Sequence, residues 1–282
     1  MINYYLLTKP GIIMGNLFTV AAGFILGSQG FIDFWLFCAT LLGLAIVIAS
    51  ACVFNNYIDR EVDQKMVRTR NRPLARGLIS GRSAIVFATL LGIIGTTILL
   101  VYTNLLTAVI ASIGFLIYVC LYSLWKGRTV YGTAIGSIAG AVPPVVGYCA
   151  ANHQLDAGAV ILFGMLILWQ MPHFFSIAIY RIKDYAAGAI PVLPIKKGMH
   201  RTKVHMVIYI IAFLFSAVLL TTFHYAGYPY LIVAMALGLL WLGLCLKGFK
   251  QPNDALWARR MFRMSLILIM GICIVIPLDR FC

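Results

Sequence analysis

Charge, and acidic charge above all, is scarce in this chain. Of its 282 residues only 11% are charged and 62% are hydrophobic, whereas a soluble domain is about a quarter charged and about half apolar. That composition excludes a soluble globular enzyme, a disordered protein and a secreted scaffold held by disulfides. It leaves a polytopic α-helical membrane protein.

Paired cysteines and alternating apolar runs are also missing. The seven cysteines are scattered without a CxxC pair, so the sequence predicts neither a disulfide framework nor a cysteine metal cluster. The apolar residues form long continuous runs, which argues against a transmembrane β-barrel. The predicted fold class is therefore all-α, a bundle of membrane-spanning helices.

Nine apolar stretches are long enough to span a bilayer, which takes about 20 helical residues. We expect them to form a single domain over residues 1–282. The predicted spans cover approximately residues 10–28, 33–55, 83–102, 105–124, 130–150, 157–180, 204–224, 228–247 and 261–279.

The basic residues divide unevenly between the two sides of these spans. Of the 22 Lys and Arg, all but Arg280 fall in the N-terminal tail or in the loops after spans two, four, six and eight. Because basic residues collect in cytoplasmic loops, we expect a cytoplasmic N-terminus and an external C-terminus. The same rule accounts for the net charge of +14 without nucleic acid as a partner.

Three of the eight acidic residues fall within residues 59–63, at the predicted cytoplasmic end of span two. Asn55, Asp59 and Asp63 are spaced at i, i+4 and i+8, so their side chains share one face of a helix. Two carboxylates at this spacing suit Mg²⁺, which prefers oxygen ligands and often bridges to substrate phosphates. The alternative is a solvated helix end whose carboxylates pair with neighbouring bases, but charge near the bilayer is costly without a function.

Side chains that suit a diphosphate follow this motif. Arg68 and Arg72 lie in the loop after span two, and Tyr122 and Lys126 are spaced at i, i+4 at the end of span four. A guanidinium binds phosphate oxygens through two parallel hydrogen bonds. The alternatives are arginine contact with anionic lipid headgroups and an interfacial tyrosine beside a lysine that extends to the membrane surface.

Polar residues also interrupt the sixth span. Gln170 and His173 lie in an apolar stretch, where polar groups usually face the bundle interior or a cavity. His173 is a candidate haem ligand or acid–base group, and its alternative role is a hydrogen bond to another helix. Beyond the span, Asp184 is a candidate ligand of a metal or diphosphate, or a partner of Lys183.

The fifth span combines small residues with a proline pair. Gly136 and Gly140 form a GxxxG pattern, which lets helices approach closely. Pro143 and Pro144 follow, and we expect this pair to kink or break the helix and to open space in the bundle.

These motifs resemble the signatures of the UbiA-type intramembrane prenyltransferases. The resemblance covers about residues 8–200 and continues more weakly to the C-terminus. It rests on Asn55-xxx-Asp59-xxx-Asp63, the run Arg68 to Leu74, and Tyr122-xxx-Lys126.

A finer match is to the branch of this family that uses haem as the acceptor. Many members of the wider family carry a second Asp-xxx-Asp motif after span six, where this chain has only Asp184, as the haem branch does. The match rests on Thr8 to Gly11, Ala139 to Pro144, Trp169 to Phe175, Lys183 to Tyr185 and Ile190 to Pro194.

The resemblance implies transfer of the farnesyl group of farnesyl diphosphate to the 2-vinyl group of haem B. Water is added in the same reaction, and the products are haem O and diphosphate. The implied cofactor is Mg²⁺. The implied site comprises Asn55, Asp59 and Asp63 for catalysis, Asp59, Asp63 and Asp184 for the metal, Arg68, Arg72, Tyr122, Lys126 and Lys183 for the diphosphate, and His173 for haem.

The resemblance also implies a multi-pass enzyme of the cell inner membrane, surrounded by lipid, with its active site facing the cytoplasm. Haem A synthase or assembly factors of a terminal haem–copper oxidase are the candidate protein partners. Two alternatives stay open. One is a sister prenyltransferase that acts on an aromatic or quinone precursor, and the more distant one is a membrane transporter.

Overall fold

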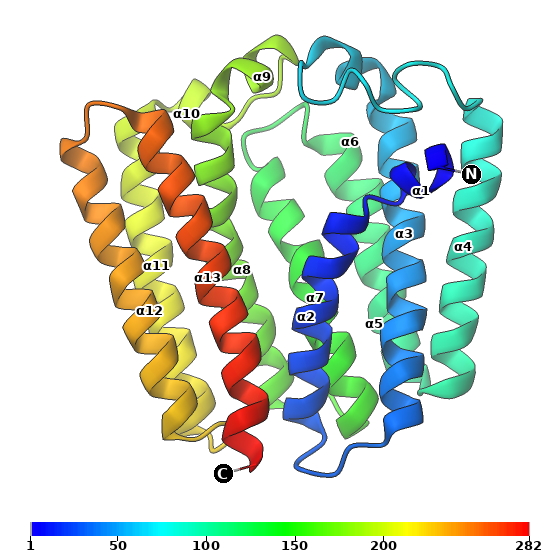
Figure 1. The fold of residues 1–282 in the computed structure, drawn as a ribbon, viewed down its shortest axis with the longest axis vertical. Helices are drawn as coiled ribbons and strands as arrows, with labels where there is room; N and C mark the ends of the chain where they lie inside the picture. The colour runs from blue at the N-terminus through cyan, green and yellow to red at the C-terminus, as the bar shows by residue number, and fades with distance from the viewer. Residues whose placement is uncertain (1, 282) are drawn as a thin grey trace.

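A computed structural model describes residues 2–281, and Met1 and Cys282 lie outside the described residues. Over that range the chain forms helices and no strand, arranged as one bundle (Figure 1). The helices are α1 (Ile2–Leu7), α2 (Pro10–Gly27), α3 (Phe34–Lys65), α4 (Gly81–Tyr102), α5 (Leu105–Leu116), the π turn η1 (Ile117–Tyr122), α6 (Ser123–Trp125), α7 (Gly132–Asn152), α8 (Ala157–Tyr180), α9 (Ile182–Ala187), α10 (Leu193–Lys196), α11 (Met199–Thr222), α12 (Tyr228–Lys247), the 3₁₀ turn η2 (Gly248–Lys250) and α13 (Asp254–Phe281).

The described residues contain nine helices that are long and apolar enough to cross a membrane, which confirms the predicted fold class. They are α2, α3, α4, α5 continued through η1 and α6, α7, α8, α11, α12 continued through η2, and α13. The largest differences from the predicted spans are polar extensions. Helix α3 continues past residue 55 to Lys65, and α13 begins at Asp254 instead of residue 261, because a helix need not stop where its apolar run stops.

Polar side chains cap the first turn of four of the spans. Asp33, Ser80, Asn104 and Asp156 each accept a hydrogen bond from a backbone N–H of the first turn, at the starts of α3, α4, α5 and α8 respectively. A cap of this kind satisfies one of the N–H groups that a helix start leaves without an intrahelical partner. These residues therefore mark where the chain re-enters the bundle.

Helix α7 lies at the centre of the bundle and packs closely against α2. A Cβ atom on Gly147 would lie 2.1 Å from the Val20 carbonyl oxygen, and one on Gly23 would lie 2.1 Å from the Pro144 carbonyl oxygen. The two backbones meet only because both positions are glycine. Of the predicted kink or break at Pro143 and Pro144, a break is not observed, since α7 runs continuously through both prolines, and Pro143 lines a cavity in the bundle.

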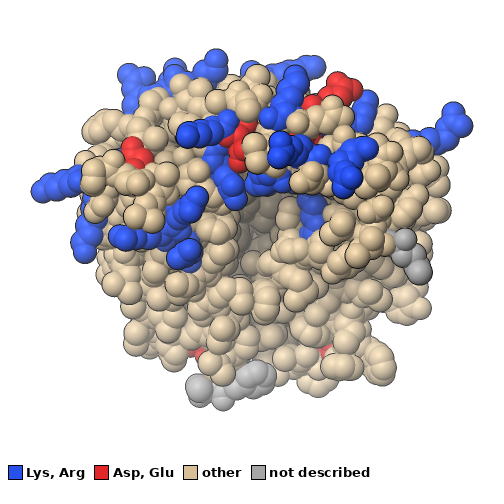
Figure 2. All heavy atoms as spheres, turned by 45° about the horizontal axis from the view of Figure 1, so that its top comes forward, with Lys and Arg blue, Asp and Glu red and all other residues tan. Residues whose placement is uncertain are grey.

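The two ends of the bundle differ in charge. The longer connections, with α9 and α10, lie at one end, and the tight turns lie at the other (Figure 1). Lys and Arg gather over the end that carries the longer connections, around a hollow in the surface (Figure 2). The acidic motif of α3 lies at this charged end.

Candidate active site

A cavity of about 400 Å³ extends into the bundle between α2, α3, α5, η1, α7, α8 and α13. Its volume falls in the range of small-molecule pockets. Most of the wall is apolar, from Leu44 and Val47 on α3 to Ile269 and Met270 on α13. The polar side chains that line it are Asn16, Thr19, Tyr118, Tyr122, Gln170 and His173.

The α3 motif lies on one buried face at the charged end of the bundle. Asn55, Asp59 and Asp63 are 2%, 7% and 2% exposed, although all three are polar. The Asp59 carboxylate pairs with the Lys126 ammonium, and Asp63 Oδ2 lies 2.8 Å from Arg72 Nη1. Each buried carboxylate is thus neutralised by a cation from a different segment, as burial of charge requires.

The nearest bases in sequence do not neutralise these carboxylates. Arg60 pairs instead with Glu61, at 3.2 Å on the surface, so the motif is not a solvated helix end. The loop after α3 turns back to bring Arg72 over Asp63, and the Thr69 hydroxyl fixes that turn by donating to the Asp63 carbonyl oxygen at 3.0 Å. The predicted Asn55, Asp59, Asp63, Arg72, Tyr122 and Lys126 are therefore brought together.

Lys9 joins this group, although no role in the site was predicted for it. It precedes Pro10 in a left-handed backbone conformation (φ 53°), which is costly for a residue with a Cβ atom. Its ammonium donates to Asn55 Oδ1 at 2.5 Å. Burial is the main cause that lowers the pKa of Lys9 to about 8, and the nearby charges of Arg72 and Lys126 contribute to the shift. Three cations therefore converge at the mouth of the cavity.

A π turn aligns the other side of this mouth. In η1 the Ser123 backbone N–H bonds to the Tyr118 carbonyl, and the Ser123 hydroxyl donates to the same oxygen at 2.9 Å. Asn55 Nδ2 then donates to Ser123 Oγ at 2.9 Å. Turns of this kind are rare and frequently occur at functional sites. Here the turn stacks Tyr118 on Tyr122, with ring centroids 5.3 Å apart.

Three predicted residues lie nearer the surface. Arg68 and Lys183 are exposed and have no ion-pair partner in residues 2–281. Asp184 lies 3.7 Å from Arg181 and not against the α3 carboxylates. The neighbouring Tyr185 was also not predicted. Burial raises the pKa of Tyr185 to about 12, while the charges of Arg68 and Lys126 oppose the shift, which puts α9 beside the cluster.

The donor set suits a metal that arrives with its substrate. Among the described residues no group of three or more His, Cys, Asp or Glu side chains is placed to hold an ion. Asp59 and Asp63 supply hard oxygen ligands, and Mg²⁺ is usually held by one or two carboxylates together with substrate phosphates and water. The residues therefore fit Mg²⁺ bound to a diphosphate, and the ligand role of Asp184 stays a prediction.

His173 lies in the cavity wall, held by an aromatic clamp. Its ring stacks on Trp169 (centroids 4.8 Å apart) and lies 4.9 Å from the Phe262 ring. Its Nδ1 lies 2.8 Å from Ser265 Oγ, so the predicted contact with another helix is present. Trp169 Nε1 donates to the Ser265 carbonyl oxygen at 3.0 Å, which fixes the same turn of α13.

The hydrogen bonds at Ser265 determine where the His173 proton sits. The Ser265 hydroxyl donates its single proton to the Phe262 carbonyl oxygen at 2.6 Å. With that proton on the bond to Phe262, we assign the His173 contact as Nδ1–H donating to Ser265 Oγ, which leaves Nε2 with a free lone pair. An imidazole oriented in this way is ready to ligate a metal through Nε2.

A layer of carboxylates and cations above a deep apolar cavity defines a membrane-embedded enzyme for an amphiphile with a diphosphate head. The comparisons with known proteins agree. Residues 16–267 match the UbiA prenyltransferase family, and the chain belongs to that family. Nine spans alone fit a transporter equally well, but family membership sets that alternative aside.

Relatives cover nearly the whole chain. The protoheme IX farnesyltransferase of Protochlamydia amoebophila (strain UWE25) is 61% identical over 99% of both chains. That of Serratia proteamaculans (strain 568) is 52% identical over 99% of this chain and 95% of its own.

Solved structures share the fold at lower identity. A digeranylgeranylglyceryl phosphate synthase superposes with a TM-score of 0.82 at 21% identity, over 99% of this chain and 97% of its own. A UbiA homologue from Archaeoglobus fulgidus bound to GPP and Mg²⁺ gives 0.66 at 14% identity, over 98% and 99%.

Proposed function

We propose that this chain transfers the farnesyl group of farnesyl diphosphate to the 2-vinyl group of haem B, with addition of water, to give haem O and diphosphate. The observation that carries the proposal is the cluster of buried carboxylates and cations at the mouth of an apolar cavity whose wall contains His173. Relatives at 52–61% identity that are named protoheme IX farnesyltransferase support the choice of donor and acceptor.

The donor would bind with its diphosphate at the mouth of the cavity and its farnesyl chain inside the bundle. Asp59 and Asp63, assisted by Asn55, would hold Mg²⁺, which when bound supplies positive charge to the diphosphate oxygens. Lys126, Arg72 and Arg68, with Tyr122 and Lys183, would bind the remaining oxygens. The farnesyl chain would extend into the apolar cavity, which excludes water from the reacting carbon.

Bond breaking starts at the diphosphate end. The bond between farnesyl C1 and oxygen breaks, and its electron pair leaves with the diphosphate, where the cations stabilise the developing negative charge. The π electrons of the vinyl group form the new carbon–carbon bond to C1. Positive charge then lies on the vinyl carbon next to the porphyrin until water adds there and loses a proton.

The acceptor would enter the cavity beside His173. With its proton on Nδ1, His173 would present the Nε2 lone pair to the haem iron and fix the plane of the porphyrin relative to farnesyl C1. Reactants that are already held in the reactive orientation need no further ordering at the moment of reaction. This prior ordering accounts for a large part of enzymatic rate enhancement. His173 is therefore proposed as a binding and orienting residue.

The proposed setting follows from the charge distribution. The basic end of the bundle (Figure 2) would face the cytoplasm by the positive-inside rule, which puts the catalytic mouth on that side. In a bacterial cell this orientation means the inner membrane. Haem A synthase and oxidase assembly factors stay candidate partners.

The test is direct synthesis by the purified protein in lipid, supplied with haem B, farnesyl diphosphate and Mg²⁺. We expect mass spectrometry to show a haem that carries a hydroxyethylfarnesyl group, and chelation of the metal to abolish it. A parallel reaction contains an aromatic acid in place of haem. Prenylation of the aromatic acid without any haem product would refute the acceptor assignment and leave the donor site standing.

A further inference from the structure

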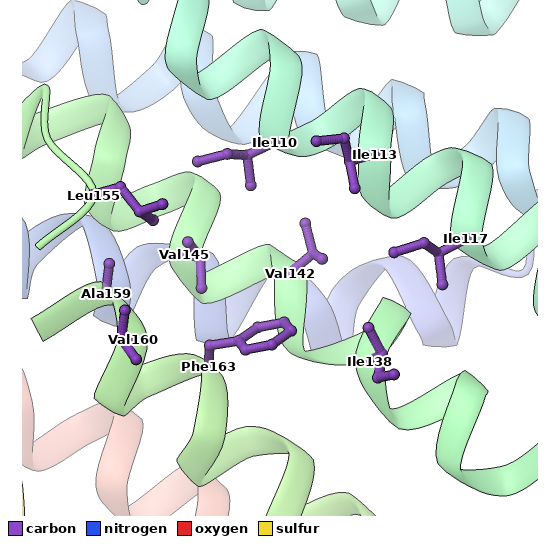
Figure 3. A pocket seen from close by; sticks show the side chains of 10 residues that line it. All are labelled: Ile110, Ile113, Ile117, Ile138, Val142, Val145, Leu155, Ala159, Val160 and Phe163. Atoms are coloured by element: carbon purple, nitrogen blue, oxygen red, sulfur yellow. The ribbon is translucent and has the colours of Figure 1, made fainter. Parts of the chain in front are cut away.

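A second apolar cavity lies on the flank of the bundle, separate from the mouth of the active site. It has a volume of about 230 Å³ and lies between α5, α7 and α8. Every side chain that lines it is a hydrocarbon, and these side chains converge on one space (Figure 3). Ile113, Leu155 and Val160 on its rim are 49%, 56% and 59% exposed, so the cavity is a groove open towards the surrounding membrane.

One side chain separates this groove from the active-site cavity. Val142 lines both spaces, and no other residue of the described chain that lines the groove also lines the active-site cavity. The Val142 side chain is 7% exposed and packs against α5 at Gly114, where an added Cβ atom would lie 2.8 Å from Val142 Cγ1. The wall between the two spaces is therefore a single valine.

The position of Val142 along α7 matches the length of the proposed donor. The first residue of α7, Gly132, contacts the backbone of Lys126, since its Cβ would lie 2.7 Å from Lys126 Cα. At 1.5 Å per residue, Val142 lies about 15 Å further along the helix. An extended farnesyl main chain is roughly 14 Å long, and each further isoprene unit adds about 5 Å, from a C–C bond of about 1.5 Å.

We propose that Val142 sets the length of the prenyl chain that the enzyme accepts. The proposal rests on the proposed function for its donor class. The farnesyl tail ends against Val142, and a chain one isoprene unit longer overruns that wall. With the Val142 side chain shortened, the active-site cavity joins the flank groove, and the fourth isoprene unit enters a space lined by hydrocarbon.

The test compares farnesyl and geranylgeranyl diphosphate as donors for wild type, Val142→Ala and Val160→Ala. Val160 is the matched control, because the same truncation enlarges the groove without touching the wall. We expect Val142→Ala to raise the kcat/KM ratio of the longer to the shorter donor roughly tenfold or more, as one or two methyl groups in an apolar pocket do. Val160→Ala should leave the ratio at the wild-type value.

A second variant and a binding measurement make the outcome decisive. Val142→Ile should act in the opposite direction and favour geranyl over farnesyl diphosphate, which tests the wall even if Val142→Ala does not fold. Calorimetry with unreactive thiodiphosphate analogues of each donor measures how binding affinity depends on chain length, without any acceptor. Unchanged donor ratios in both Val142 variants would overturn the proposal. Failure of wild type to prenylate haem, with the calorimetric affinity ratios shifted as expected, would instead refute only the proposed acceptor.

Discussion

Replacing Ser265 by alanine should weaken haem binding although Ser265 itself touches no part of the proposed substrate. Its hydroxyl accepts the Nδ1 proton of His173 at 2.8 Å and is fixed in turn by the Phe262 carbonyl. Without that acceptor the Nδ1–H group is buried without a partner, which costs about 1–3 kcal/mol. The imidazole can avoid the cost by moving its proton to Nε2, and the lone pair that would ligate iron is then lost.

The size of the effect follows from this geometry. Removal of the hydrogen-bond partner of a metal-ligating histidine typically lowers metal affinity by about 10–100-fold, and we expect haem affinity to fall by that factor in Ser265→Ala. His173→Ala should remove the ligand and change the Soret spectrum of bound haem. Ser265→Thr keeps the hydroxyl and should restore both the affinity and the spectrum.

The assay is titration of the purified protein with haem B, followed by absorbance. Ser176→Ala is the matched control, because Ser176 is a fully buried serine on the same helix as His173 and its hydroxyl bonds only to the Pro172 carbonyl oxygen, at 2.7 Å. Equal affinity in Ser265→Ala and wild type would refute the positioning role. An unaltered spectrum in His173→Ala would refute iron ligation altogether.

Three further predictions concern the metal site and the packing of the bundle. Asp59→Asn and Asp63→Asn should each lower kcat/KM by roughly 100-fold or more, because each removes a negative ligand, while the protein still inserts into the membrane. Full activity in the double variant would refute the metal site. Gly147→Ala should lower the unfolding free energy by about 1–3 kcal/mol, since its Cβ would lie 2.1 Å from a backbone oxygen of α2. The control Gly164→Ala, with no atom within 4 Å of the added Cβ, should be neutral or stabilising by up to about 1 kcal/mol. Thermal unfolding in detergent measures both variants, and equal melting temperatures would contradict the close approach. Lys203→Met removes an ammonium that bonds to the Gly248 carbonyl at 2.8 Å and to an aspartate at the start of α13. The unfolding free energy should fall by about 1–3 kcal/mol, which lowers the melting temperature, while KM for the donor should not change.

The spans and the acidic motif could be predicted because their signals are local. An apolar run of about 20 residues has to form a helix in a membrane, so the nine spans followed from composition alone. The spacing of Asn55, Asp59 and Asp63 put them on one face wherever the helix was placed. Only the ends of the helices differed, because the polar extensions of α3 and α13 carry no hydropathy signal.

The residues that sequence reasoning missed depend on contacts between distant segments. Lys9 looked like one basic residue of a short tail, and only the turn before Pro10 brings its ammonium to Asn55, 46 positions along the chain. Ser265 is a single serine in an apolar span, 92 positions from the histidine that it orients. The position of Lys9 before Pro10 was an available signal, but no local pattern points to Ser265.

The ion pairs at the mouth explain how charged groups persist at this depth and still become available to a substrate. Without substrate, Asp59 and Asp63 are each neutralised by one cation, which keeps the energetic cost of burying them low. A Mg²⁺–diphosphate unit carries both positive charge, on the metal, and negative charge, on the phosphate oxygens. In the proposed function, Asp59 and Asp63 would hold the metal in place of Lys126 and Arg72, and these two cations would bind the phosphate oxygens. Metal alone would leave the cations without partners, and diphosphate alone would leave the carboxylates without partners, so the arrangement favours binding of the two together. By this argument, either component alone would bind more weakly than the two together.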